Sequence, residues 1–284
     1  VATFVGFAFM FGDLGKMDFM VQQIMAGIRP ASLIAVPMFI LAADIMTRGQ
    51  SANRLIDMVM KFVGHIKGGL AVSTAAACTL FGAVSGSTRA TVVAVVSPLR
   101  PRMLKAGYKD SFVLALIINA SDIAFLIPPS IGMIIYGVVS NTSISELFIA
   151  GVGPGLLILM MFAVYRAFYA TIHKVPTEAK ASWPARWQAV RRAIWPLGFP
   201  VIIVGGIYGG VFSPTEAAAV CVLYAVILEF VVFRSLKPIE LYRIAKSTGL
   251  ITAVVFILVA AGAAFSWIIS FAQIPQAILA SIGL

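Results

Sequence analysis

Two polar interruptions in otherwise apolar stretches of this sequence carry residue types that could bind an ion. One is Ile127-Pro128-Pro129-Ser130, inside the apolar stretch 111–139. Proline has no N–H, so Pro128 and Pro129 release the carbonyls of Ala124 and Phe125 from helical hydrogen bonds. In a membrane these carbonyls need another partner, either a bound cation or a neighbouring hydroxyl or water. The candidate cation ligands that follow from this chemistry are Ser121, Asp122 and the carbonyls of Ala124 and Phe125.

The other interruption is Ser85-Gly86-Ser87, near the middle of the apolar stretch 68–98. Gly86 permits a turn, and the two serines supply oxygens. A helix that ends at this turn presents free carbonyls, and a helix that begins there presents free N–H groups. Carbonyl, hydroxyl and carboxylate oxygens suit Na⁺, whereas helix N-termini suit an anionic substrate. The two interruptions together predict coupled binding of a cation and an anion near the middle of the membrane.

Arg89 is the single basic residue deep inside an apolar stretch, directly after the predicted turn. Its guanidinium could pair bidentately with a substrate carboxylate, with Thr88 and Ser130 as further substrate ligands. Alternatively, Arg89 could form a structural ion pair with Asp122. Ser130 is also suited to cap the helix that resumes after the break. Both interpretations of Arg89 are open at the level of the sequence.

The composition requires a membrane protein around these residues. The 284 residues are 61% apolar and 11% charged, with a mean hydropathy of +1.00. Soluble domains are nearer half apolar and one quarter charged, so a water-soluble enzyme is excluded. The two cysteines exclude a disulfide framework and offer no metal-binding spacing. The sequence contains no phosphate-binding loop motif, so energy for transport would come from an ion gradient.

The basic residues predict the topology. Of the 21 Lys and Arg, 18 fall in the four stretches 48–67, 98–110, 166–192 and 234–246. If all four face the cytoplasm, the net charge of +10 reflects the positive-inside rule and not nucleic-acid binding. Segment 68–98 must then enter and leave by the same face, which predicts a re-entrant helical hairpin with its tip at 85–88. The predicted complete spans are 31–47, 111–139, 145–165, 193–211, 215–233 and 248–271.

Four further features of the sequence bear on the fold. Residues 50–66 repeat apolar side chains at helical spacing opposite a charged face, which predicts an amphipathic helix in the cytoplasmic interface. Ser213-Pro214-Thr215-Glu216 predicts a capping box at a helix start. Glu229, near the end of a span, is expected to meet the cytoplasmic surface. The apolar run 1–11 is too short to span and is expected to be the end of a longer helix.

At these motifs the sequence resembles the large membrane (permease) subunit of tripartite ATP-independent periplasmic (TRAP) transporters. The resemblance extends over nearly the whole chain, in the family's order. It rests on Ala35-Val36-Pro37-Met38-Phe39-Ile40-Leu41-Ala42, Gly68-Gly69-Leu70-Ala71, Phe81-Gly82-Ala83-Val84-Ser85-Gly86-Ser87, Gly107-Tyr108, Leu126-Ile127-Pro128-Pro129-Ser130-Ile131, Leu147-Phe148-Ile149-Ala150-Gly151 with Pro154-Gly155, and Ser213-Pro214-Thr215-Glu216-Ala217-Ala218-Ala219.

The resemblance implies an all-α polytopic protein of the bacterial inner membrane, with the elevator-type fold of the ion transporter superfamily, inverted repeats and re-entrant hairpins. It implies Na⁺-coupled uptake of an organic acid, such as sialic acid or a dicarboxylate. The implied partners are a periplasmic substrate-binding protein, a small four-helix membrane subunit and the lipid bilayer, with no nucleic acid and no cofactor besides Na⁺. It places a sodium site at Ser85, Gly86 and Ser87 and along 121–129.

The resemblance also divides the chain. Residues 1–165 are expected to form a first inverted repeat, with the amphipathic arm 50–66, the hairpin 68–98 and the broken helix 111–139. Residues 166–192 are expected to form a cytoplasmic linker, and 193–284 a partial second repeat. The family continues with a second hairpin and a second Pro-Pro helix, so the chain is expected to be a fragment that does not transport alone. The family usually has small residues where this chain has Arg89 and Asp122.

Other functions fit the same residues less well. A binding-protein-independent Na⁺/dicarboxylate or citrate carrier of the same superfamily would share the fold. An ion channel would need a continuous polar stripe, which no predicted span shows. An intramembrane hydrolase would need a nucleophile beside a base, and Asp122 near Ser85 is the single possible pair, so an enzyme is not expected.

Overall fold

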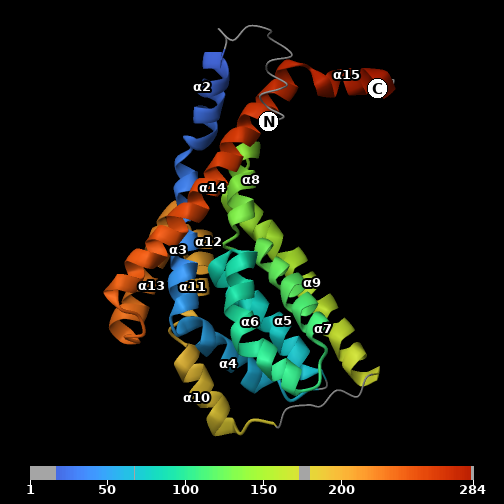
Figure 1. Ribbon diagram of the computed structural model, residues 1–284, viewed down its shortest axis with the longest axis vertical. Coiled ribbons are helices and arrows are strands. Elements are labelled where there is room, and N and C mark those ends of the chain that lie inside the picture. The colour runs from blue at the N-terminus through green and yellow to red at the C-terminus, as the bar shows by residue number, and fades with distance from the viewer. Residues whose placement is uncertain (1–16, 67, 173–179, 283–284) are drawn as a thin grey trace.

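The structure, a computed structural model, describes residues 17–66, 68–172 and 180–282, and within these ranges the chain is helical without strands. The all-α prediction is therefore confirmed. The first eleven residues and positions 173–179 of the predicted linker lie outside the described residues. Figure 1 shows a tall bundle in which α15 lies at one end and α10 at the other.

The first half of the chain forms α2 (Met17–Ile28), η2 (Ala31–Ile34), α3 (Ala35–Arg48), α4 (Ser51–Val63), α5 (Gly69–Ser85), α6 (Thr88–Lys105), α7 (Asp110–Ser121), η3 (Asp122–Phe125) and α8 (Ile131–Ser140). The second half forms α9 (Ile144–Ile172), α10 (Trp183–Ala193), α11 (Gly198–Pro200), η4 (Val201–Gly205), α12 (Gly206–Tyr208), α13 (Pro214–Val226), η5 (Ile227–Val232), α14 (Pro238–Phe271) and α15 (Ile274–Ile282).

Helices α5 and α6 form the predicted helical hairpin. They pack against each other and are joined by Gly86 and Ser87 alone. Gly86 has a φ of +59°, a conformation that glycine adopts without steric cost. Most of α5 is buried, because it packs against α4, α6, α7 and α9. In Figure 1 the outer ends of both helices point to the end of the bundle where α10 lies, and their joined ends point to its middle.

The predicted broken helix is also present. Helix α7 continues into the 3₁₀ turn η3, the chain then breaks at 126–130, and α8 resumes beyond the prolines. The Pro128–Pro129 peptide bond is cis. Helix α9 returns alongside, in contact with α5, η3 and α8. The predicted spans 111–139 and 145–165 thus run in opposite directions, as Figure 1 shows.

Four helical segments are long and apolar enough to cross a membrane, among the described residues. They are Ala31–Arg48, Ile144–Tyr165, Pro214–Val232 and Pro238–Phe271. A fifth candidate is the pair Trp183–Ala193 and Gly198–Tyr208, bent by 50° at the break between them. These segments overlap five of the six predicted spans, and the sixth is the broken helix α7–η3–α8. Ser213 and Glu216 form the predicted capping box at the start of α13.

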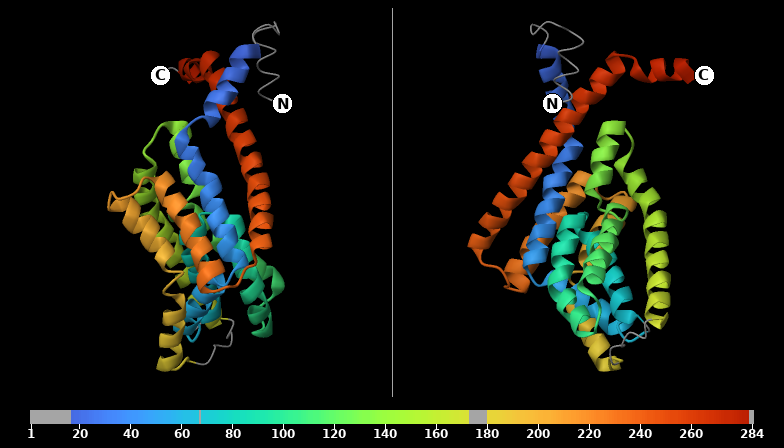
Figure 2. Two further views of the ribbon diagram at one scale, coloured as in Figure 1. Left: turned by 90° about the vertical axis from the view of Figure 1, so that its left-hand side faces the viewer. Right: turned by 45° about the vertical axis from the view of Figure 1, so that its right-hand side comes forward.

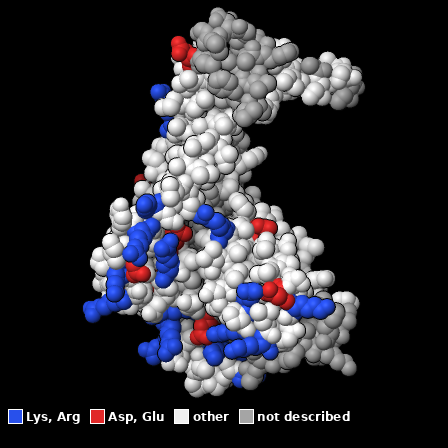
Figure 3. Space-filling model, viewed as in Figure 1, with Lys and Arg blue, Asp and Glu red and all other residues white. Residues whose placement is uncertain are grey.

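The basic side chains gather at one end of the molecule. On the face shown in Figure 3, most Lys and Arg lie over the lower part, where α4, α6, α10 and the lower ends of α13 and α14 lie in the same view of Figure 1. The part of the bundle above it, where the upper turns of α3, α8 and α14 lie, carries few charges on that face. This distribution agrees with four basic stretches at a single membrane face.

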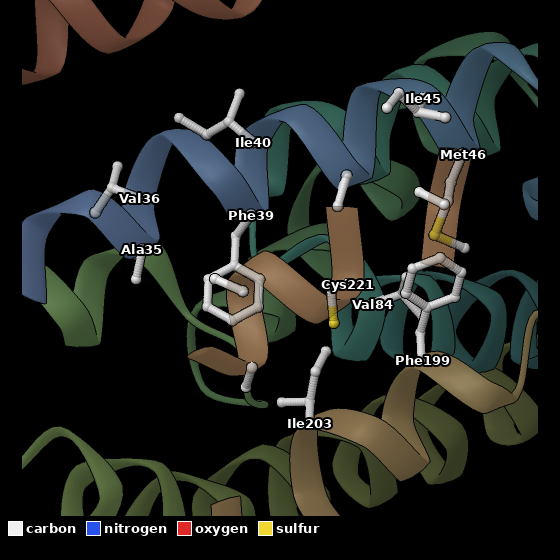
Figure 4. Close-up of a cluster of buried hydrophobic side chains, with 14 of the residues drawn as sticks. Ala35, Val36, Phe39, Ile40, Ile45, Met46, Val84, Phe199, Ile203 and Cys221 are labelled. Atoms are coloured by element: carbon white, nitrogen blue, oxygen red, sulfur yellow. The ribbon is translucent and has the colours of Figure 1, made fainter. Parts of the chain in front are cut away.

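A buried core joins the two halves of the chain. Helix α3 packs against α13 and α14, and the views of Figure 2 show α3 and α13 side by side. In Figure 4, Phe39 of α3 points toward Cys221 of α13 and Ile203 of η4, and all three are buried. Val84, close to the hairpin tip, belongs to the same cluster. The core therefore holds α3 in a fixed position beside the hairpin.

Helix α4 is the predicted amphipathic helix, but its apolar face packs on protein. Leu55, Ile56, Val59 and Met60 are buried between α5 and α10, whereas Phe62, expected on the apolar face, is exposed. The helix is held at its start by a side chain from a distant part of the sequence.

That side chain is Glu229 of η5, and the prediction that it meets the surface is wrong. The residue is fully buried. Its carboxylate accepts hydrogen bonds from the backbone N–H groups of Gln50 and Ser51, at 2.9 Å each, and from the hydroxyls of Ser51 and Ser235. Glycine at position 49 leaves space for the Glu229 carboxylate, because a Cβ there would overlap it. Glu229 thus caps the N-terminus of α4.

Candidate functional site

The hairpin tip and the broken helix are in direct backbone contact. The N–H of Ile131 donates to the carbonyl of Gly86 at 3.2 Å. A Cβ on Gly86 would overlap the carbonyl oxygen of Pro129, so only glycine permits this approach. One turn earlier, a Cβ on Gly82 would lie 2.8 Å from the Cβ of Ala124. The two interruptions that the sequence singled out are therefore brought together.

The tip carries a compact set of hydroxyl groups. The hydroxyls of Ser85 and Thr91 are 3.0 Å apart, and the Thr91 hydroxyl also donates to the carbonyl of Ser87 at 2.9 Å. The side chain of Ser87 caps α6 by accepting from the N–H of Ala90 at 3.4 Å. These bonds hold the tip in one conformation and gather several oxygens close together.

At the break, two carbonyls are left without the donors that a helix would provide. The N–H groups of Leu126 and Ile127 both donate to the carbonyl of Ile123, at 2.9 and 3.2 Å. The later positions that would bond Ala124 and Phe125 are prolines, which have no N–H. The prediction that the Pro-Pro pair frees these two carbonyls is in accord with this geometry.

Helix α9 supports the break from its other side. A Cβ on Gly151 would overlap the carbonyl oxygen of Leu126, and a Cβ on Gly155 would lie 2.9 Å from the side chain of Ile127. These two glycines lie one turn apart on α9. Their missing side chains let the helix backbone pack directly on the break.

Thr88 and Ser130 begin the two helices that start at the site. The side chain of Ser130 is buried and caps α8 by accepting from the N–H of Met133 at 3.2 Å. The hydroxyl of Thr88 is buried and has no hydrogen-bond partner. A buried hydroxyl without a partner is rare and calls for an explanation, such as a bound ion or water.

Two predicted ligands of the break are directed elsewhere. The hydroxyl of Ser121 donates to the carbonyl of Ile117 at 2.7 Å and lies 3.6 Å from the sulfur of Cys78 on α5. The side chain of Asp122 is exposed. The proposed ion pair between Asp122 and Arg89 is absent from the structure, since the sole salt bridge within the described ranges joins Arg100 and Asp110. The 3₁₀ turn that begins at Asp122 alters the side-chain directions that a continuous helix would give.

A cavity of about 120 Å³ lies between the hairpin tip, α3 and α14. Gly86, Ser87 and Arg89 line it from the hairpin, and Phe125 and Ile131 from the broken helix. Its remaining lining residues are Ile40, Ala43 and Asp44 of α3, Ala90 of α6, and Ile251 and Val255 of α14. The predicted substrate residue Arg89 therefore does face a cavity at the tip.

Asp44 is a site residue that sequence reasoning missed. It is half-buried in the middle of the bundle, and one carboxylate oxygen accepts from the hydroxyl of Thr248 on α14 at 3.2 Å. The signal was present, because an ionisable residue inside a membrane span is a functional candidate by default. Asp44 lies within the predicted span 31–47 and meets this criterion in the same way as Asp122 and Arg89.

The sequence of this chain matches a family model and several known proteins. Residues 1–282 match the family model "Tripartite ATP-independent periplasmic transporter, DctM component". The chain is 79% identical over 283 residues to the ectoine TRAP transporter large permease protein TeaC of Halomonas elongata, covering 100% of this chain and 66% of that protein. It is 75% identical over 282 residues to the ectoine/5-hydroxyectoine large permease protein UehC of Ruegeria pomeroyi, covering 99% and 66%.

A more distant relative is named for a different solute. The C4-dicarboxylate TRAP transporter large permease protein DctM of Pseudomonas aeruginosa is 40% identical over 247 residues, covering 87% of this chain and 58% of that protein. The chain thus spans about two thirds of the length of the two ectoine relatives. Together with its apolar helices, these matches place the chain in the bacterial inner membrane as a multi-pass protein. The chain belongs to the DctM family, the large permease component of TRAP transporters.

Proposed function

We propose that this chain forms most of a permease subunit that takes up ectoine or 5-hydroxyectoine by Na⁺ symport. The observation that carries the choice of solute is the contrast in identity. The two relatives named for ectoine are 79% and 75% identical to this chain, whereas the relative named for C4-dicarboxylates is 40% identical. Ectoine carries a carboxylate but also a cationic amidinium, so it is not the simple organic acid that the sequence analysis expected.

The coupling to Na⁺ is proposed from the chemistry of the tip and the break. Sodium, a hard cation, is held by oxygen ligands, and this place gathers hydroxyl and carbonyl oxygens. The groups that would hold the ion are the hydroxyls of Ser85 and Thr88 and the carbonyls of Ala124 and Phe125. The unpartnered Thr88 hydroxyl and the two carbonyls without helical donors support this assignment. Bound there, Na⁺ would supply positive charge beside the cavity where an anionic group enters.

The partners are proposed on the strength of the family. A periplasmic binding protein would deliver the solute, and a small membrane subunit would complete the membrane complex. The division into inverted repeats at 1–165 and 193–284, and the elevator-type movement, stay predictions. The function belongs to the whole permease with its partners, so every test uses the full-length protein.

The test is uptake into proteoliposomes. The full-length permease and its small subunit are reconstituted, the binding protein and radiolabelled ectoine are added outside, and an inward Na⁺ gradient is compared with an equal K⁺ gradient. We expect uptake with Na⁺ alone, competed by unlabelled hydroxyectoine and not by malate or sialic acid. Uptake that is equal in K⁺ would refute the coupling, and efficient competition by malate would refute the choice of solute.

A further inference from the structure

The cavity at the hairpin tip is faced by two opposite charges that do not neutralise each other. Asp44 lies on α3 and Arg89 at the start of α6, and both line the cavity. They also line an adjoining hollow of about 380 Å³ that extends along α14 past Ser247. No salt bridge joins them, although Arg89 lies within electrostatic range of Asp44. Both charges are therefore free to meet a solute.

Each charged group is held in a different way. One oxygen of Asp44 accepts from Thr248, which fixes the carboxylate on the wall formed by α3 and α14. Arg89 is exposed and contributes to the opposite wall, two residues beyond the tip. Arg48, the other cation in electrostatic range of Asp44, lines only the adjoining hollow and lies at the end of α3. A charge inside a membrane protein is costly, so the half-buried carboxylate of Asp44 indicates a ligand that brings a cationic group to it. Arg89 lines the same cavity and can meet an anionic group of that ligand.

The walls between the charges are apolar. Ile40 of α3 and the pair Ile251 and Val255 of α14 line the cavity beside Asp44, and Phe125 and Ile131 line it beside the tip. Such a lining suits the methylene and methyl groups of a small ring, while a few polar groups set its orientation. The combination of an acid, a base and apolar walls does not suit a dicarboxylate, because Asp44 would repel one of its two charges.

We propose that Asp44 and Arg89 recognise the two ends of a zwitterionic solute. This inference rests on the proposed function, because ectoine carries a carboxylate and an amidinium on one small ring. The guanidinium of Arg89 pairs with the carboxylate, in the bidentate geometry that Arg favours. The carboxylate of Asp44 accepts hydrogen bonds from the N–H groups of the amidinium. Attraction between these charges is stronger in the cavity than in water.

The test compares two variants of the full-length permease, Asp44→Asn and Arg89→Gln, in the reconstituted uptake assay. Asp44→Asn keeps the size of the side chain and removes its charge, whereas Arg89→Gln removes the charged guanidinium and keeps a shorter polar side chain. Removing one partner of a charge pair in such a cavity costs about 2 kcal/mol or more, so we expect the uptake rate at a fixed, low concentration of ectoine-loaded binding protein to fall by roughly 30-fold or more in each variant. Asp57→Asn on α4 and Arg102→Gln on α6 are matched controls, because both lie outside the lining of this cavity. They are expected to behave as wild type.

Competitors separate recognition from a structural role. A ring carboxylate without the amidinium is expected to inhibit wild-type uptake weakly. With Asp44→Asn its inhibition should be unchanged or stronger, and with Arg89→Gln it should be lost. If Asp44→Asn weakens ectoine and the ring carboxylate equally, Asp44 has a structural role and the inference is wrong. If wild type transports ectoine and Asp44→Asn transports it equally well, the inference also fails while the proposed function stands. If wild type itself takes up no ectoine, the proposed function fails first.

Discussion

The capping of α4 by Glu229 leads to a measurable prediction for Glu229→Gln. Glutamine has nearly the same shape, but it keeps a single acceptor oxygen and replaces the other by an NH₂ group. At least one of the four donors around Glu229 then faces another donor, and the remaining bonds lose their ionic character. Hydrogen bonds to charged groups contribute about 1.5–3 kcal/mol each, and an unsatisfied buried donor costs about 1–3 kcal/mol.

These values predict a loss of about 3 kcal/mol in the free energy of unfolding, and with it a melting temperature lower by several degrees. The measurement is the thermal unfolding of the full-length permease purified in detergent. Gly49→Ala should produce a similar loss, because its Cβ would displace the same carboxylate. Glu146→Gln is the matched control, since that side chain is exposed. A Glu229→Gln protein that melts with wild type would show that the buried carboxylate is not needed as a cap.

Three further predictions follow from the site and its surroundings. Gly86→Ala should abolish uptake, because its Cβ would overlap Pro129. The control is Gly107→Ala, since Gly107 also has a positive φ but has open space around it. This control should cost only about 1–2 kcal/mol of backbone strain and keep uptake. Thr88→Val should raise the Na⁺ concentration for half-maximal uptake. It should not lower the melting temperature, since the lost hydroxyl has no protein partner. An unchanged Na⁺ dependence would show that Thr88 is not part of the ion site. Arg100 holds the pKa of the Asp110 carboxyl below its usual range, so any stabilisation from this ion pair is present at neutral pH and disappears as the pH falls through that lowered pKa. Melting temperatures of wild type and Asp110→Asn should therefore converge in acid, and a difference that persists there would contradict the assignment.

The parts of the fold that follow from local chemistry were predictable from the sequence. Pro128 and Pro129 must break a helix wherever it lies, and Gly86 between two serines in a long apolar segment indicates a turn. The charge pattern then forces segment 68–98 to return to its own side. These arguments give the hairpin, the break and their approximate bounds, and the structure places them in contact.

What depends on contacts between distant residues was not predictable in the same way. Glu229 is buried because it meets the start of α4, about 180 positions earlier, and nothing in its own neighbourhood indicates that partner. Asp122 was expected at the site because it is a carboxylate inside a predicted span, just before the break. The 3₁₀ turn that begins at Asp122, and the exposure of its side chain, follow from the packing of the break. Asp44 differs from both, since its position inside a predicted span was enough to make it a functional candidate. That Asp44 and Arg89 line the same cavity follows only from the packing of α3 on the hairpin.

The contacts that hold the tip against the break have a consequence for how such permeases diversify. Gly82, Gly86 and Gly151 bring main chain close to main chain, and Gly155 brings it close to Ile127, so the frame of the proposed ion site depends on the absence of side chains at these four positions. The charges proposed to face the solute come from separate positions on α3 and α6. Cargo could therefore be changed at positions 44 and 89 while the coupling machinery is inherited intact. Re-targeting a permease of this kind would then be a problem of a few side chains rather than of the fold.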